Sequence, residues 1–169
     1  MSSARAQTNL GLRPYLPEDA PLLAEIFRAS VEELTGDDYD PAQQRAWAAT
    51  ADDEEAFAKR LGRGLALVAT TEGAPVGFAS LVGGEKIDML YVHPGATRRG
   101  VAALLVDALE KLAAGRGAKR LTAVASDTSL GFYEHRGFVP VRRNTVRCNG
   151  EWFANTTVEK KLTEEKAAP

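Results

Sequence analysis

The chain has 169 residues, of which 44% are hydrophobic and 26% are charged, and its formal net charge is -2. This composition is typical of a globular protein and excludes a disordered, collagen-like or coiled-coil chain, while the length fits one domain. The near balance of basic and acidic residues provides no general electrostatic footprint for nucleic acid or for an anionic membrane.

The ends of the chain and its rarer residues narrow the class further. Residues 1–9 lack the apolar region of a secretory signal, so we expect a flexible leader and a cytoplasmic protein. Uncharged runs such as residues 74–84 are shorter than the roughly 20 apolar residues of a membrane span, and glycines interrupt them. One cysteine, Cys148, and two histidines, His93 and His135, offer few metal ligands, so we expect no metal.

The first third of the chain predicts one strand followed by three helices. Residues 10–16 are the strand candidate, and the acidic and proline residues after it open a helix that runs to Leu34. Asp40 and Gln43 have the spacing of a capping box, which predicts a short second helix. Acidic residues at the start and basic residues at the end favour a third helix that stops before Gly62.

The rest of the chain predicts a sheet interrupted by helices. The apolar runs LALVATT, PVGFASLV and KIDMLYV are typical of strands, and the first two form a hairpin. An amphipathic helix ends near Gly115, LTAVA is a further strand, and a short helix ends at His135. Two runs that flank Asn149 and Gly150 close a terminal hairpin. This order predicts an α/β fold with a mixed sheet and helices on both faces.

The stretch YVHPGATRRGVAALL is the best candidate for an anion site. At the start of a helix about four backbone N–H groups lack partners and the helix dipole adds about half a positive charge, so a diphosphate can bind the backbone. Gly100 and the small Ala102 leave room for a ligand, while Arg98 and Arg99 add positive charge. The loop has neither the Gly-Lys-Ser of a Walker loop nor three spaced glycines. On spacing alone, a helix start beside solvated arginines is the commoner explanation.

Together with FYEHRGF about thirty residues later, this stretch resembles the cofactor-binding core of the GCN5-related N-acetyltransferase (GNAT) family. The family motif is Gln or Arg, two residues, Gly, one residue, then Gly or Ala, and this chain reads TRRGVA with Thr97 in the first position. The family's element order fits residues 10–162, which leaves a loose tail at 163–169, and NTVRCNGEWFAN is similar to its YafP-like branch. The resemblance implies a GNAT-type, mostly antiparallel sheet, and acetyl-CoA (coenzyme A) as cosubstrate.

The resemblance also implies how the cosubstrate is held. A bulge would splay one strand from its neighbour, so that its free backbone groups bind the pantetheine arm, with the pyrophosphate on the following turn. Ser126 stands where many relatives have an Asn that binds this arm, although it can equally cap the next helix. The implied cofactor-binding residues are Leu90, Tyr91, Val92, Arg98, Arg99, Gly100, Val101, Ala102, Ala103, Ser126 and Tyr133.

Three residues are candidates for catalysis. By resemblance, Tyr133 is the general acid that protonates the leaving thiolate, and its reference pKa of about 10 suits this role. Without the family, an aromatic pair with Phe132 that packs a helix on the sheet is the favoured interpretation. The base that some relatives carry early in the cofactor strand falls on Lys86 here. Asp88, on the same face of that strand, is our first choice for the base, and Glu85 or a water chain is the alternative.

The acceptor should meet the first two helices, the GDDYD loop and the last hairpin, which border the cofactor gap in the family. Trp152 and Asn155 are the candidate substrate contacts, although ordinary strand packing is the commoner explanation of Trp152, and a solvent-facing ladder is the alternative for Asn155. A two-residue turn would turn Trp152 to the face opposite Phe153. The acidic loop would favour a cationic amine, or it is simply solvated.

We therefore expect an N-acetyltransferase that moves an acetyl group from acetyl-CoA to a primary amine of a small molecule by direct attack in a ternary complex. We expect no nucleic acid or membrane partner, and a homodimer is one option for its assembly. The alternative is a CoA-binding regulatory protein without catalysis, which Thr97 and the missing base at Lys86 suggest. A nucleotide-binding switch protein ranks last.

Overall fold

The structure is a computed structural model that describes residues 9–162. The leader expected at residues 1–9, apart from Asn9, and the tail expected at 163–169 lie outside the described residues. The strands are β1 (Leu10–Pro14), β2 (Leu65–Thr71), β3 (Ala74–Val82), β4 (Lys86–Val92), β5 (Arg120–Ser126), β6 (Val139–Cys148) and β7 (Glu151–Lys161). The α-helices are α1 (Ala20–Leu34), α2 (Pro41–Ala48), α3 (Glu54–Leu61), α4 (Val101–Gly115) and α5 (Leu130–His135). Short 3₁₀ turns, η2, η3 and η4, cover Pro17–Asp19, Ala49–Ala51 and Pro94–Ala96.

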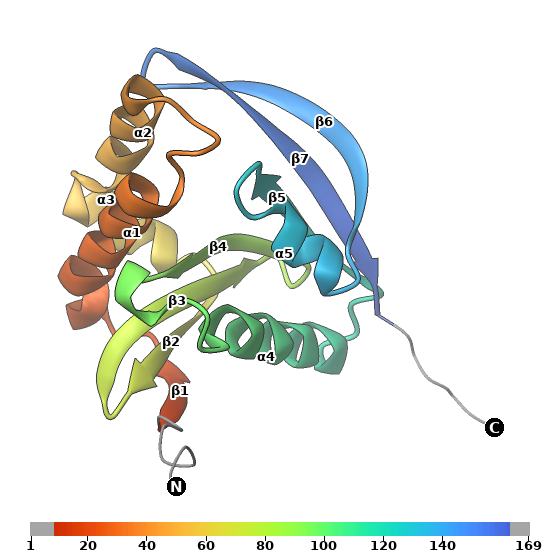
Figure 1. The fold of residues 1–169 in the computed structure, drawn as a ribbon. Coiled ribbons are helices and arrows are strands. Elements are labelled where there is room, and N and C mark those ends of the chain that lie inside the picture. Colours follow the sequence, from red (N-terminus) through yellow and green to blue (C-terminus); the bar gives the residue numbers. More distant parts are fainter. Residues whose placement is uncertain (1–8, 163–169) are drawn as a thin grey trace, which may run out of the picture.

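The seven strands form one sheet in the order β1-β2-β3-β4-β5-β7-β6. Neighbouring strands are antiparallel except β4 and β5, which run parallel. Figure 1 shows α1, α2 and α3 gathered on one side of the β2–β4 part of the sheet and α4 on the other. The predicted mixed sheet with helices on both faces is confirmed.

Local signals in the sequence explain where two of these elements begin and turn. Asp40 Oδ1 accepts a hydrogen bond from the Gln43 N–H and Gln43 Oε1 accepts one from the Asp40 N–H, each at 2.8 Å, which closes the predicted capping box at α2. Asn149 and Gly150 have φ of 46° and 83°, as the tight turn of a two-residue hairpin requires. This turn pairs Val146 with Phe153, as the sequence predicts.

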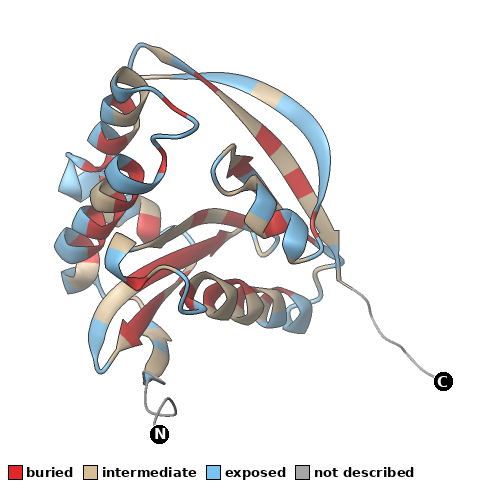
Figure 2. Cartoon of the chain, in the orientation of Figure 1, coloured by how far each residue is buried: buried red, intermediate tan, exposed pale blue. Residues whose placement is uncertain are grey.

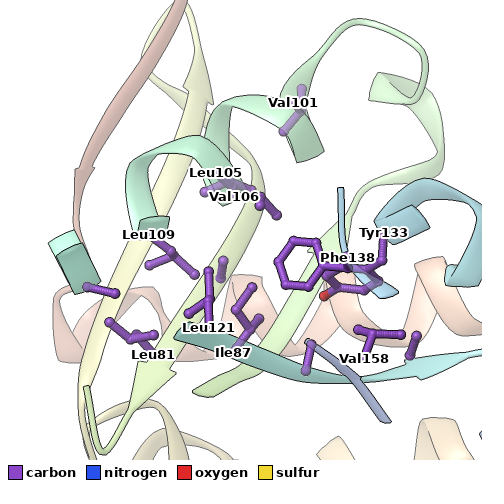
Figure 3. Packing of buried hydrophobic residues seen from close by; sticks show 14 of the residues in the cluster. Leu81, Ile87, Val101, Leu105, Val106, Leu109, Leu121, Tyr133, Phe138 and Val158 are labelled. Carbon is purple, nitrogen blue, oxygen red and sulfur yellow. The ribbon is translucent and has the colours of Figure 1, made fainter. Parts of the chain in front are cut away.

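Two hydrophobic cores hold the helices against the sheet. The core under α4 contains Leu105, Leu109 and Leu121 together with Tyr133 and Phe138 (Figure 3). The core under α1 and α3 contains Leu23, Phe27 and Phe57 from the helices and Phe78 and Met89 from the sheet. The sheet is therefore buried on both faces over its central strands, as Figure 2 shows, whereas the edge strand β6 is largely exposed.

One position of the predicted α1 stripe is not buried. Leu34, the last residue of the helix, remains 37% exposed. Its side chain is exposed because it lines the cleft described below.

A bulge in β4 opens the centre of the sheet. Ser80 of β3 pairs with Met89, but the next residue of β3, Leu81, pairs with Ile87, so Asp88 is an extra residue in β4. Ile87 consequently packs in the α4 core, while Met89, two residues later, packs in the α1 and α3 core. On the other side, β4 pairs with β5 only at Lys86 and Ile87, so the two strands separate beyond the bulge.

None of the helices in the described part of the chain is long and apolar enough to cross a membrane.

Candidate active site

A cleft of about 780 Å³ lies where β4 and β5 separate. Its walls come from both halves of the chain: β4, the start of α4, the end of β5, α1, α2, α5 and the terminal hairpin. Residues that are far apart in sequence therefore meet here, among them Tyr39, Asp88, Gly100, Tyr133 and Phe153.

One end of the cleft is formed by the backbone at the start of α4. Gly100 precedes the helix with a φ of 82°, and no side chain caps this end. The first helical hydrogen bond runs from the Leu104 N–H to the Gly100 carbonyl at 2.9 Å, so the N–H groups of Val101, Ala102 and Ala103 have no partner within the helix. This arrangement provides three converging donors for an anion.

The surroundings of this turn favour the same ligand. Arg98 and Arg99 are both exposed, and Arg98 has a φ of 63°. A Cβ at Gly100 would meet no atom within 4 Å, so the requirement for glycine comes from its left-handed backbone and not from crowding. Positive charge and free amides thus point to the same open space.

Thr97, which departs from the family motif, stabilises the preceding loop. Its hydroxyl donates a hydrogen bond to the Pro94 carbonyl at 3.1 Å. In the same loop His93 Nδ1 accepts a hydrogen bond from the Gly95 N–H at 2.9 Å. Both side chains are engaged in shaping the turn.

The edge of β4 that faces the gap has free backbone groups. The His93 N–H binds the Val76 carbonyl at 2.8 Å, which fixes the alternation of the antiparallel β3–β4 pair. By this alternation the backbone of Tyr91 faces β3, whereas that of Leu90 and Val92 faces the gap. The expectation that the Tyr91 backbone is free for a ligand is therefore corrected, and Tyr91 lines the cleft with its side chain instead.

Tyr133 lies in the cleft wall with only 4% of its surface exposed. It packs edge-on against Phe132, with the ring centroids 5.5 Å apart, and against Phe138, with the ring centroids 5.1 Å apart. Figure 3 shows Tyr133 beside Phe138. Burial, with a smaller contribution from Tyr91, raises the pKa of Tyr133 well above its ordinary value, and no group within residues 9–162 hydrogen-bonds its hydroxyl. The aromatic packing expected without the family is present, and it holds a protonated, unpartnered hydroxyl at the cleft.

Ser126 lines the cleft and also stabilises the turn before α5. Its Oγ lies 3.1 Å from Ser129 Oγ and accepts a hydrogen bond from the Ser129 N–H at 3.1 Å. The turn-stabilising interpretation is thus visible directly, whereas a contact with the cofactor stays a prediction.

The two candidate bases have different surroundings. Asp88, whose side chain is 14% exposed, forms an ion pair with Arg60 from the last turn of α3. Arg60 Nε donates to Oδ2 at 2.8 Å and Nη2 donates to Oδ1 at 3.3 Å. Burial lowers the pKa of Arg60, but its hydrogen bonds and attraction to Asp88 raise it overall. Glu85 is half exposed, lies 3.8 Å from Arg120 and is not part of the cleft wall.

Aromatic side chains form the other end of the cleft. The rings of Tyr39, Trp47 and Phe153 contact one another, with centroid distances of 5.4 Å for Tyr39–Trp47, 5.7 Å for Tyr39–Phe153 and 6.1 Å for Trp47–Phe153. We call these three residues the aromatic wall. Trp47 Nε1 also donates a hydrogen bond to the Tyr91 hydroxyl at 3.3 Å. Tyr39 before α2, Trp47 in α2 and Phe153 in β7 thus form one surface, which no short sequence motif could have indicated.

Tyr39 also ties this end of the cleft together. Its hydroxyl donates a hydrogen bond to the Ala154 carbonyl in β7 and accepts one from the Asp127 N–H after β5, both at 2.9 Å. Burial raises the pKa of Tyr39, which keeps the hydroxyl in its donating form. One side chain therefore connects the acidic loop to two other segments.

Of the two predicted substrate contacts, Asn155 lines the cleft and Trp152 does not. Trp152 is 56% exposed, and the Arg147 guanidinium lies 5.3 Å from its ring on the outer face of the hairpin. Trp152 does not line the cleft, because alternation along β7 points Phe153 inward in its place. Asn155 does line the cleft, and its Oδ1 accepts a hydrogen bond from Asn144 at 3.0 Å.

The acidic loop does not face the cleft with its carboxylates. Asp38 accepts a hydrogen bond from Thr128 at 2.8 Å, and Asp40 is occupied in the capping box. The predicted acceptor surface included the second helix and the GDDYD loop, but Trp47 and Tyr39 were not singled out within them, and Arg60 had no predicted site role. The one available signal was Tyr39, a large aromatic residue within an otherwise acidic segment.

Comparisons with known proteins agree with this geometry. A family model described as an acetyltransferase (GNAT) domain matches residues 35–160. The chain is 38% identical over 147 residues to the uncharacterized N-acetyltransferase YafP of Escherichia coli, covering 87% of this chain and 93% of that protein. The crystal structure of a GCN5-related N-acetyltransferase from Rhodopseudomonas palustris superposes with a TM-score of 0.90 at 58% identity, over 92% of this chain and 98% of that one. PaiA N-acetyltransferase from Thermoplasma acidophilum, solved with coenzyme A, shares the fold with a TM-score of 0.76 at 20% identity, over 90% of this chain and 99% of that one.

Proposed function

Because this chain belongs to the GCN5-related N-acetyltransferase (GNAT) family, we propose that it transfers an acetyl group from acetyl-CoA to a primary amine of a small molecule. Transfer takes place by direct attack with both substrates bound together. The observation that carries this proposal is the row of unpartnered N–H groups at Val101–Ala103, which opens onto the same cleft as the Tyr133 hydroxyl.

The residues of this chain fit coenzyme A at one end of the cleft. The amides of Val101–Ala103 would hold the pyrophosphate, with Arg98 and Arg99 adding positive charge. The gap-facing backbone of Leu90 and Val92 would bind the pantetheine arm as an added strand does. When bound, acetyl-CoA supplies an acetyl group activated as a thioester, and the backbone N–H near Leu90 would polarise its carbonyl.

Tyr133 is the proposed general acid. Its buried, unpartnered hydroxyl stays protonated far above neutral pH and lies in the cleft wall. It can therefore hold a proton at Oη and donate it to the thiolate as the carbon–sulfur bond breaks. The tyrosinate left behind is the stronger base and regains a proton from solvent.

Asp88 is the proposed base that takes the proton of the attacking amine, directly or through water. It is the carboxylate that the cleft contains, and the bulge in β4 sets it on the α3 side of the strand beside Arg60. Glu85 is not used in this proposal because it lies outside the cleft wall next to Arg120. Since Arg60 already binds both Asp88 oxygens, water remains the alternative route for this proton.

A thiol-release assay with acetyl-CoA and a panel of small amines tests the proposal. We expect turnover on at least one amine, with one thiol released per amide formed. Saturable binding of coenzyme A without turnover on any amine would instead support the CoA-binding regulatory protein, which the engaged state of Asp88 favours as second candidate. The single domain over residues 10–162, the cytoplasmic location and the assembly state stay predictions.

A further inference from the structure

The acceptor end of the cleft combines aromatic rings, whose own polar atoms are engaged, with the polar side chain of Asn155. In the aromatic wall the Tyr39 hydroxyl is engaged by Ala154 and Asp127, and the Trp47 indole N–H is engaged by Tyr91. Phe153 has no polar atom in its side chain. The polar atoms of the wall are thus satisfied inside the protein. Tyr39 and Phe153 keep 5% and 7% of their surface exposed and Trp47 is half-buried, so the ring surface left for a ligand belongs chiefly to Trp47.

The charges of the cleft are nearly balanced at this end. Within the described chain, the charged side chains of the cleft wall are Arg60, Lys86, Asp88 and Arg98. Arg98 belongs to the phosphate end, and Arg60 and Asp88 neutralise each other through two hydrogen bonds. The acidic residues Asp38 and Asp40 are engaged elsewhere. A polycation would therefore find no uncompensated carboxylate to bind in the cleft.

We propose that the acceptor is an amine carried by a flat, uncharged aromatic body that packs against the aromatic wall. This inference rests on the proposed acetyl transfer and specifies its substrate class. Aromatic rings gain most from contact with other rings at edge-on or offset geometry, which the existing wall already displays. The hydroxyl of Tyr91 accepts from Trp47 and keeps its own proton, which can bind a heteroatom of the acceptor.

An aromatic amine can react in a site where the carboxylate of Asp88 is already bound by Arg60. Nitrogen attacks, a nitrogen–carbon bond forms, the sulfur–carbon bond breaks, the amine loses one proton and the thiolate takes one from Tyr133. When the nitrogen is attached directly to a ring, it is uncharged at neutral pH and needs no deprotonation before attack. When an alkyl spacer separates them, the nitrogen is cationic and depends on Asp88 or water. Aniline and 2-phenylethylamine distinguish these two forms.

The sequence makes a direct binding test available. The chain has two tryptophans, Trp47 in the aromatic wall and Trp152 outside the cleft. The variant Trp152→Leu leaves Trp47 as the single tryptophan, whose emission can be excited selectively over that of the tyrosines. With coenzyme A present, aniline or 2-phenylethylamine should change its fluorescence saturably, whereas butane-1,4-diamine at the same concentration should not. An equal response to the diamine, or no response to either aromatic amine, would overturn the proposal.

Two neighbouring positions of β7 provide a matched pair for turnover. Phe153→Leu removes a ring from the wall and keeps an apolar side chain, whereas Trp152→Leu removes a ring from the outer face. We expect Phe153→Leu to lower kcat/KM for the aromatic amines about ten-fold, as lost apolar contacts do, and Trp152→Leu to leave it unchanged. Turnover that prefers the diamine, or equal effects of the two variants, would refute the aromatic acceptor while leaving acetyl transfer intact. If no amine is acetylated, the proposed function is contradicted. The fluorescence titration would then still show whether aromatic amines bind at the aromatic wall.

Discussion

The two ends of the cleft are built in different ways. At the phosphate end the backbone is the binding group: three amides after Gly100 and the gap-facing edge of β4. At the acceptor end the binding groups are side chains. Long-range hydrogen bonds hold them in place, such as the two of Tyr39, whose partners lie 88 and 115 residues away in the sequence. The first end is a local property of one strand–turn–helix segment, and the second exists only after the whole chain has folded.

This difference predicts where a substitution acts. Changes at the phosphate end should alter affinity for coenzyme A, and changes at the acceptor end should alter use of the amine. Tyr133 and Asp88, the proposed acid and base, line the same cleft and should affect turnover itself.

The largest expected effect belongs to Tyr133→Phe. Removing the general acid should lower kcat by about 10² to 10⁴ with little change in coenzyme A affinity. No described residue hydrogen-bonds the hydroxyl, so the thermal midpoint Tm should barely move. Because the pKa of Tyr133 is raised, the wild-type enzyme should also show no loss of activity from its ionisation between pH 7 and about pH 10. A variant with unchanged kcat would remove Tyr133 from this role.

Asp88→Asn should lower kcat by about 10² and remove the limb of the pH profile that reports deprotonation of the base. The amide keeps an oxygen for Arg60 but cannot take a proton. Glu85→Gln, outside the cleft wall, is the matched control and should leave the profile unchanged. An unaltered profile in Asp88→Asn would assign proton removal to water.

Gly100→Val should weaken coenzyme A binding about 10- to 100-fold, measured by calorimetry. A branched side chain at a φ of 82° costs about 1 to 3 kcal/mol, and relieving this strain would move the amides of the turn. Gly73→Val is a control with the same conformation, since Gly73 has a φ of 86° in the β2–β3 turn and equally open surroundings. If both variants lower stability but keep the wild-type affinity, the turn at Gly100 does not hold the ligand.

Tyr39→Phe should have the smallest effect on activity, a rise in KM for the amine of about 3- to 10-fold with unchanged coenzyme A affinity. The change leaves the Ala154 carbonyl and the Asp127 N–H without their partner, which should cost about 1 to 3 kcal/mol of stability. Tyr15→Phe removes a hydroxyl away from the cleft wall and should alter neither quantity. A change in coenzyme A affinity in Tyr39→Phe would mean that the two ends are not independent.

The same contrast explains how much could be predicted from the sequence. The helix start at Gly100, the capping box of Asp40 and the turn at Asn149 depend on residues a few positions apart, and all three are present. The family resemblance supplied the gap between β4 and β5 and the place of Tyr133 in the cleft.

The rest depends on contacts that no local pattern encodes. The direction of the Tyr91 backbone is set by its pairing with β3, so the expectation of free groups there was wrong. Trp152 and Phe153 are adjacent in sequence, and only the fold decides which of them faces the cleft. Arg60 appeared as a charge at a helix end, but the bulge at Asp88 makes it the partner of the carboxylate.

The most direct test of the central claim is an NMR titration of the ¹⁵N-labelled chain with coenzyme A. We predict saturable binding in which the amide resonances of Val101, Ala102 and Ala103 shift more than those in the β2–β3 turn. Absence of saturable binding, or binding that leaves these three amides unchanged, would contradict the assignment of the α4 start as the phosphate site.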